Sequence, residues 1–225
     1  MSKLILYHGS QKIVEKPLFG AGKPYNDYGL GFYCTQNIEL AKEWACPVIE
    51  DGFANCYELE TEGLLILDLQ KETFCMLHWL AILVNNRRFD LDTAVLRRGV
   101  HYLTQNFLPD LTAYDLIKGY RADDSYFSFA KSFLSNQISY SQLCEAMKLG
   151  KLGEQIVLKS QTAFEKINFT GYELAEGKKY HALRKERMDK AKEDYYKMLE
   201  AADISGLFMR DLILQEVKTD DSRLR

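Results

Sequence analysis

Short apolar runs that stop at glycine or polar residues predict strands in the first third of the chain. The run at residues 4–8 ends at a glycine, and residues 31–35 follow a loop rich in glycine and proline over 17–31. Residues 54–60 and 64–69 flank a Thr-Glu-Gly turn, which is typical of a hairpin. These patterns predict two separate strands, followed by two strands that pair as a β-hairpin.

Apolar residues at helical spacing predict a helix after the second strand. Ile38, Ala41 and Ala45 fall on one helix face, and either Asn37 or Thr35 can serve as the N-cap. Pro47 cannot continue the helix and is expected to end it.

The rest of the chain predicts a helical block, further strands and a long helix. Helical spacing dominates residues 72–148, strands return over 154–169, and a charged helix follows over about 178–203. Residues 207–217 fit a strand or a helix equally. The order of elements predicts an α+β fold in one domain over 1–225, with the helical block as an insertion.

Composition narrows the classes of protein that the chain can belong to. Hydrophobic residues make up 47% of the chain, so it can bury a sizeable core. The formal charge of −3 argues against a protein whose function is non-specific binding to nucleic-acid phosphates. No apolar run approaches the roughly 18 residues of a membrane span, and the first apolar run is too short for a signal peptide. The five cysteines form no CxxC pair, and no histidine lies at zinc-ligand spacing from a cysteine. These features predict a cytoplasmic protein with reduced thiols, no membrane association and no metal.

Three short segments place polar and aromatic residues at the ends of predicted strands. They are Tyr7-His8-Gly9-Ser10, then Gly29-Leu30-Gly31-Phe32-Tyr33 with Trp44 eleven residues later, and Gly153-Glu154-Gln155-Ile156-Val157. Because strand ends commonly carry functional side chains, we expect the three segments to meet in one cleft.

This order of motifs resembles the His–Tyr–Glu signature of ADP-ribosyltransferases of the diphtheria-toxin and poly(ADP-ribose) polymerase branch. Residues 119–127 and 149–155 look more specifically like a bacterial family of ADP-ribosyltransferase-like proteins, catalogued mainly as a domain of unknown function. That closer resemblance spans about residues 4–175. It implies a split β-sheet, NAD as the substrate, and a reaction that breaks the nicotinamide–ribose bond. Prokaryotic proteins of this kind are frequently toxins, so it also implies a macromolecular acceptor and a small antitoxin-like partner.

The resemblance assigns roles that suit the chemistry of these residues. Tyr33 and Trp44 would be aromatic walls for a flat cationic leaving group, and His8 would hold the adenosine ribose. Gly9 would let its backbone approach the carboxamide, and Ser10, also counted among the cofactor-binding residues, would make local hydrogen bonds.

Glu154 is the carboxylate expected at the ribose, where it would offset the charge of an oxocarbenium-like transition state. Gln155 follows directly, and neighbouring strand residues point to opposite faces. The spacing to Ile156-Val157 favours Glu154. If Gln155 faces the cleft instead, the site lacks its carboxylate, and the chain could be a non-catalytic module that binds NAD or a partner. Simple NAD hydrolysis is a third reading.

The segment after residue 120 offers a second set of charged residues. Arg121, Asp123 and Asp124 could border the acceptor site or form a lid, although an ion pair and a helix cap are the commoner roles of such residues.

Overall fold

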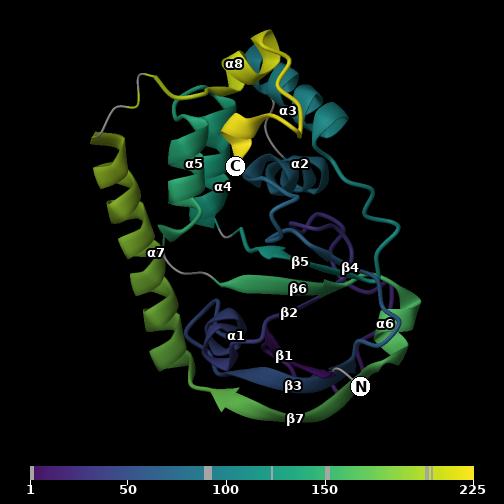
Figure 1. Cartoon of the computed structure of the whole chain (residues 1–225). Helices are drawn as coiled ribbons and strands as arrows, with labels where there is room; N and C mark the ends of the chain where they lie inside the picture. Colours follow the sequence, from purple (N-terminus) through teal and green to yellow (C-terminus); the bar gives the residue numbers. More distant parts are fainter. Residues whose placement is uncertain (1–2, 89–92, 123, 150–152, 201–202, 204) are drawn as a thin grey trace.

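The chain folds as a mixed α+β protein with two β-sheets (Figure 1). The structure, a computed structural model, describes residues 3–88, 93–122, 124–149, 153–200, 203 and 205–225. The strands are β1 (Lys3–Ser10), β2 (Phe32–Cys34), β3 (Gly52–Glu60), β4 (Ile66–Asp68), β5 (Leu116–Tyr120), β6 (Glu154–Leu158) and β7 (Ile167–Ala175). The helices are α1 (Ile38–Ala45), α2 (Met76–Asn86), α3 (Ala94–Asn106), α4 (Asp124–Leu134), α5 (Tyr140–Ala146), α6 (Gln161–Glu165), α7 (Gly177–Glu200) and α8 (Met209–Leu214), with a 3₁₀ turn at Ser222–Leu224.

The strands divide into a three-stranded sheet in the order β1-β3-β7 and a four-stranded sheet in the order β2-β6-β5-β4. Neighbours pair antiparallel except β4 and β5, which are parallel. A bridge between Tyr7 and Thr35 links the end of β1 to the chain just after β2, so the two sheets meet at the point where the first two motifs lie.

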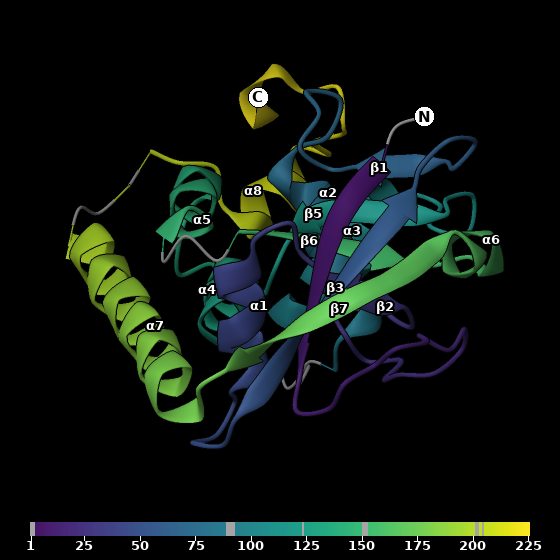
Figure 2. The same ribbon diagram turned by 90° about the horizontal axis from the view of Figure 1, so that it is seen from below.

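The two sheets and a group of helices lie in successive layers. Figure 1 shows the β1-β3-β7 sheet at the bottom, the second sheet above it, and helices α2, α3, α4, α5 and α8 at the top. One hydrophobic cluster fills the space between the sheets and a larger one joins the second sheet to the helices. Helix α7 runs along the side of these layers and contacts α1, α4 and α5 (Figures 1 and 2).

Local signals explain where several helices begin. The side chain of Asn37 accepts hydrogen bonds from the backbone N–H groups of Glu39 and Leu40, as its position predicts. Ser139 and Gln142 form a capping box at the start of α5. These contacts satisfy backbone donors that a helix start otherwise leaves unpaired.

Three expectations for the middle and late parts of the chain are wrong. Residues 72–148 are not wholly helical, because β5 lies inside them and pairs with both β4 and β6. Residues 54–60 and 64–69 do not form a hairpin, because β3 and β4 belong to different sheets. The strands expected over 154–169 are interrupted by α6, and β7 begins only at Ile167.

Long-range pairing is the physical reason for the first two differences. The Asp115 carboxylate accepts from the Leu65 N–H at 2.8 Å, and the Leu65 carbonyl accepts from the Asp115 N–H at 2.9 Å. These bonds draw the chain after Thr61–Gly63 to the second sheet, which a pattern of local spacing does not reveal. The predicted charged helix corresponds to α7, and residues 207–217 contain α8. Among the described residues, no helix combines the length and the apolar composition that a membrane crossing requires.

Candidate functional site

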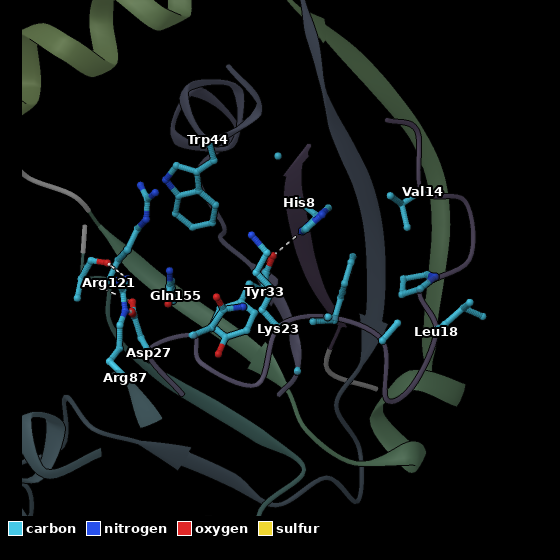
Figure 3. Close-up of a pocket in the computed structure, with 18 of the residues that line it drawn as sticks. His8, Val14, Leu18, Lys23, Asp27, Tyr33, Trp44, Arg87, Arg121 and Gln155 are labelled. Carbon is cyan, nitrogen blue, oxygen red and sulfur yellow. Dashed lines mark hydrogen bonds and ion pairs between the residues drawn. The ribbon is translucent and has the colours of Figure 1, made fainter. Parts of the chain in front are cut away.

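A cavity of about 580 Å³ gathers residues from all three motifs (Figure 3). His8 and Gly9 reach it from β1, Tyr33 from β2, Trp44 from α1 and Gln155 from β6. The segment between β1 and β2 contributes Val14, Lys16, Pro17, Leu18, Ala21, Gly22, Lys23, Asn26, Asp27 and Gly31, and Phe32, Arg87, Arg121 and Ala122 complete the lining.

His8 is held in one orientation by its neighbours. Its Nδ1 lies 2.7 Å from the Tyr33 carbonyl oxygen, and its ring centroid lies 4.4 Å from that of Phe32. A carbonyl can only accept, so Nδ1 carries the proton and neutral His8 keeps Nε2 as an acceptor. Burial lowers the pKa of His8, which favours this neutral form.

This burial predicts a pH dependence of folding. The unfolded chain takes up a proton near the ordinary pKa of 6.5, whereas the folded chain does so only at lower pH. The contribution of His8 to stability is therefore complete above pH 6.5 and is lost as the pH falls from 6.5 through the lowered pKa. We expect the difference in free energy of unfolding between the wild type and His8→Asn to shrink over that range in urea titrations. Burial also lowers the pKa of His78, but that group is present in both proteins and cancels. A difference that grows on acidification would contradict this expectation.

The Tyr33 hydroxyl is committed to the loop before β2. It donates to the Gly29 carbonyl at 2.5 Å and accepts from the Tyr28 N–H at 3.1 Å. Burial raises the pKa of Tyr33, so the hydroxyl stays protonated. What Tyr33 offers the cavity is its ring, as expected for an aromatic wall.

Trp44 lies on α1 under a guanidinium group. The Arg121 Cζ is 4.5 Å from the centroid of the Trp44 ring, a cation–π contact between two elements that line the cavity. The indole Nε1 is buried and has no hydrogen-bond partner. One face of the indole is therefore already covered by a cation.

Gln155, and not Glu154, faces the cavity. Pairing sets Tyr33 opposite Val157, so Gln155, two residues before Val157, shares the face of Tyr33. Gln155 is 6% exposed, and its Oε1 is buried without a partner.

Glu154 points to the other face of β6. Its carboxylate lies 3.1 Å from the Lys118 Nζ, which also lies 3.7 Å from Asp68. Burial raises the pKa of Glu154, and the Lys118 ammonium opposes that shift. The expectation that Glu154 lines the cleft is thus wrong, and the strand register is the reason.

An ion pair between a buried carboxylate and a partly exposed arginine, which the motifs did not reveal, lies at the same cavity. The Arg87 Nε donates to the Asp27 Oδ1 at 2.8 Å, and Asp27 is 4% exposed. Burial raises the pKa of Asp27, and the positive charge of Arg87 opposes the rise. Asp27 lies inside the turn that the Gly29 N–H closes on the Asn26 carbonyl. No local signal in the sequence points to its pairing with Arg87, which is 60 positions away.

Gly9 and Ser10 differ in their relation to the cavity. A Cβ at Gly9 would lie 1.9 Å from the Ala41 carbonyl oxygen, so the bare glycine lets α1 pack on β1. Ser10 does not line the cavity. Its hydroxyl donates to the Lys12 carbonyl and accepts from Asn55, the local role that the sequence predicts.

The residues expected at an acceptor site are only partly described. Arg121 lines the cavity, whereas Asp123 and the side chain of Asp124 lie outside the described residues. Residues 150–152, which directly precede the third motif, also lie outside the described residues. Among the described residues, no three His, Cys, Asp or Glu side chains lie together as metal ligands.

The charge of the lining suits an anionic ligand. The lining includes one carboxylate, Asp27, and four cationic side chains, those of Lys16, Lys23, Arg87 and Arg121. The formal charge of the whole chain, in contrast, is −3. The described lining is thus locally positive, with aromatic rings and an unpaired amide oxygen among the cations.

Comparison with known proteins identifies the family and no activity. No curated protein and no solved structure matches the chain. A family model described as a protein of unknown function (DUF3990) matches residues 4–169, which include every described residue that lines the cavity. The chain therefore belongs to the DUF3990 family.

Proposed function

We propose that the cavity binds NAD⁺ and that the chain is an ADP-ribosyltransferase, which passes ADP-ribose to a macromolecular acceptor. The observation that carries the proposal is the meeting of His8, Tyr33, Trp44 and Gln155 in one cavity. They come from β1, β2, α1 and β6. His8, Tyr33 and Trp44 belong to the motifs through which the sequence resembles this class of enzymes, and Gln155 stands next to Glu154, the third residue of that signature.

The lining offers a complement to the nicotinamide, the diphosphate and the ribose hydroxyls of NAD⁺. The rings of Tyr33 and Trp44 suit the flat nicotinamide, and the ammonium groups of Lys16 and Lys23 suit the diphosphate. His8 Nε2 and Gln155 Oε1 are acceptors for ribose hydroxyls.

In the proposed reaction the bond between C1′ of the ribose and the nicotinamide nitrogen breaks, and its electron pair leaves with nicotinamide. Positive charge then develops at C1′ and the ring oxygen, and an acceptor nucleophile attacks C1′ and loses a proton to solvent. The Gln155 oxygen is a partial negative charge, which strengthens its hydrogen bond to a ribose hydroxyl as that charge develops.

The orientation of β6 favours a second candidate function. A neutral amide stabilises positive charge less than the expected carboxylate, so the same cavity also fits a module that binds NAD⁺ without cleaving it. Hydrolysis, with water as the acceptor, is a variant of the enzyme reading.

The resemblance also implies a biological role for the proposed enzyme and a protein partner. The enzyme would act in the cytoplasm as a toxin or phage-defence effector, and a small antitoxin-like protein would neutralise it. The basic cavity predicts that such a protein presents acidic side chains to the lining.

Incubation of the purified chain with adenylate-labelled NAD⁺ and cell extract tests the proposal. Nicotinamide release with label on macromolecules supports transfer, and release with free ADP-ribose shows hydrolysis. Calorimetric binding of NAD⁺ without any nicotinamide release would leave the binding module, and absence of binding would reject both.

Truncation of the Trp44 ring should weaken NAD⁺ binding. We expect Trp44→Ala to cost about 1–3 kcal/mol of affinity through lost stacking and apolar burial, and Trp44→Phe to retain most of it. Calorimetric titration of NAD⁺ into each variant measures this. Equal losses for the two variants would indicate that Trp44 supports the fold and does not contact the ligand.

A further inference from the structure

The chain that follows β5 is fixed at two consecutive points beside the cavity. The Tyr120 carbonyl accepts from the Tyr28 hydroxyl at 2.6 Å and from the Trp79 Nε1 at 3.1 Å. Arg121 follows, so the backbone on its N-terminal side is anchored in the core.

The ion pair of Asp27 and Arg87, called the clamp below, anchors the backbone on the C-terminal side of Arg121. The Ala122 N–H donates to the Asp27 Oδ2 at 2.9 Å, and the Arg87 Nη2 donates to the Ala122 carbonyl at 3.0 Å. The Arg87 Nε to Asp27 Oδ1 bond closes the set. Both backbone polar groups of Ala122 are therefore held by one ion pair, in which Asp27 is buried and Arg87 is partly exposed.

Stability alone does not account for such a pair. Burial removes water from the Asp27 carboxylate, and the cost of that desolvation offsets much of its attraction to Arg87. The planar fork of Arg87, with one arm on Asp27 and another on the Ala122 carbonyl, supplies geometry instead. Arg121, between the two anchors, lies over Trp44.

We propose that Asp27 and Arg87 are positioning residues, which fix the backbone around Arg121 so that its guanidinium lies on Trp44 at the cavity and takes part in transfer to the acceptor. The contribution to transfer rests on the function proposed above. The placement of Arg121 does not, and it can be tested without NAD⁺.

Indole N–H signals in ¹⁵N NMR test the placement, because the chain has only two tryptophans. Arg121→Ala defines the position of the Trp44 signal without the guanidinium. Arg87→Lys keeps the positive charge but cannot span Asp27 and the Ala122 carbonyl, so its Trp44 signal should move toward that of Arg121→Ala. Arg88→Lys is the matched control. Arg88 is exposed, stacks on Tyr25 with its Cζ 4.0 Å from the ring, and should leave the signal unmoved.

Steady-state transfer tests the consequence. We expect Arg87→Lys and Arg121→Ala to lower kcat for transfer about 10²-fold, as misplaced catalytic groups do, with a much smaller change in the KM of NAD⁺. Asp27→Asn is a second variant, in which the amide oxygen can still accept from Ala122 while the charge is lost, and it should show the same split.

An unmoved Trp44 signal in both Arg87→Lys and Asp27→Asn would overturn the proposal. The proposal would also be overturned if these two variants melted at a lower temperature and changed kcat and the KM of NAD⁺ to the same extent. That pattern is the signature of a merely structural pair. If the wild type releases no nicotinamide, the proposed function fails, and the NMR result still decides whether the clamp places Arg121.

Discussion

Gln155→Ala should lower nicotinamide release from NAD⁺ about 10²–10³-fold, while Glu154→Gln should leave it nearly unchanged. The reason is the register of β6, which turns Gln155 into the cavity and pairs Glu154 with Lys118 on the opposite face. The Gln155 oxygen gains strength as a hydrogen-bond acceptor only when the ribose becomes positive, so its loss should affect kcat more than NAD⁺ affinity. Single-turnover assays with each variant, together with calorimetric Kd values, separate the two effects.

Gln155→Glu is the matched control for this prediction. It keeps an acceptor oxygen at the same place and adds the charge that the resemblance leads one to expect, so release should be retained. Full activity in Gln155→Ala together with a large loss in Glu154→Gln would mean that the functional face of β6 is the one that carries Glu154. If wild-type protein binds NAD⁺ without releasing nicotinamide, but Gln155→Glu releases it, the natural chain is the binding module.

Gly9→Ala should destabilise the fold by about 3 kcal/mol, the upper end for a group forced into a packed site. The added Cβ would lie 1.9 Å from the Ala41 carbonyl oxygen and 2.8 Å from the Ala45 nitrogen, both of them backbone atoms of α1. A rigid helix cannot yield as a flexible side chain can, so α1 must move away from β1. Because Trp44 is part of α1, NAD⁺ affinity should fall as well. Urea unfolding and calorimetric titration measure the two losses.

Ser10→Ala, one residue along β1, is the control. It removes a hydroxyl that bonds to Lys12 and Asn55 outside the cavity, and it should cost about 1 kcal/mol of stability with little effect on NAD⁺ binding. Equal stability of Gly9→Ala and the wild type would show that α1 and β1 are less closely packed than these distances require.

Two local features of the sequence were enough to predict β1 and α1, two of the elements that carry the site. A run of apolar residues ending in glycine marks β1, and Asn37 followed by apolar residues at helical spacing marks α1. Such signals lie within a few residues of one another, because they depend on backbone conformation and on one buried face. The meeting of His8, Tyr33 and Trp44 was also predictable, since each lies next to one of these elements in the order that the resemblance implies.

Contacts between distant segments decided the rest. The parallel pairing of β4 with β5 depends on residues about 50 positions apart, and the Asp27–Arg87 pair spans 60. The choice between Glu154 and Gln155 depended on which residue of β6 lies opposite Tyr33, and a shift of one position exchanges the two faces of a strand. The sequence alone thus determined local elements such as β1 and α1 and the meeting of the three motifs in one cavity. Only the tertiary structure decided which side chains reach it, because strand register and buried ion pairs are properties of the packed chain.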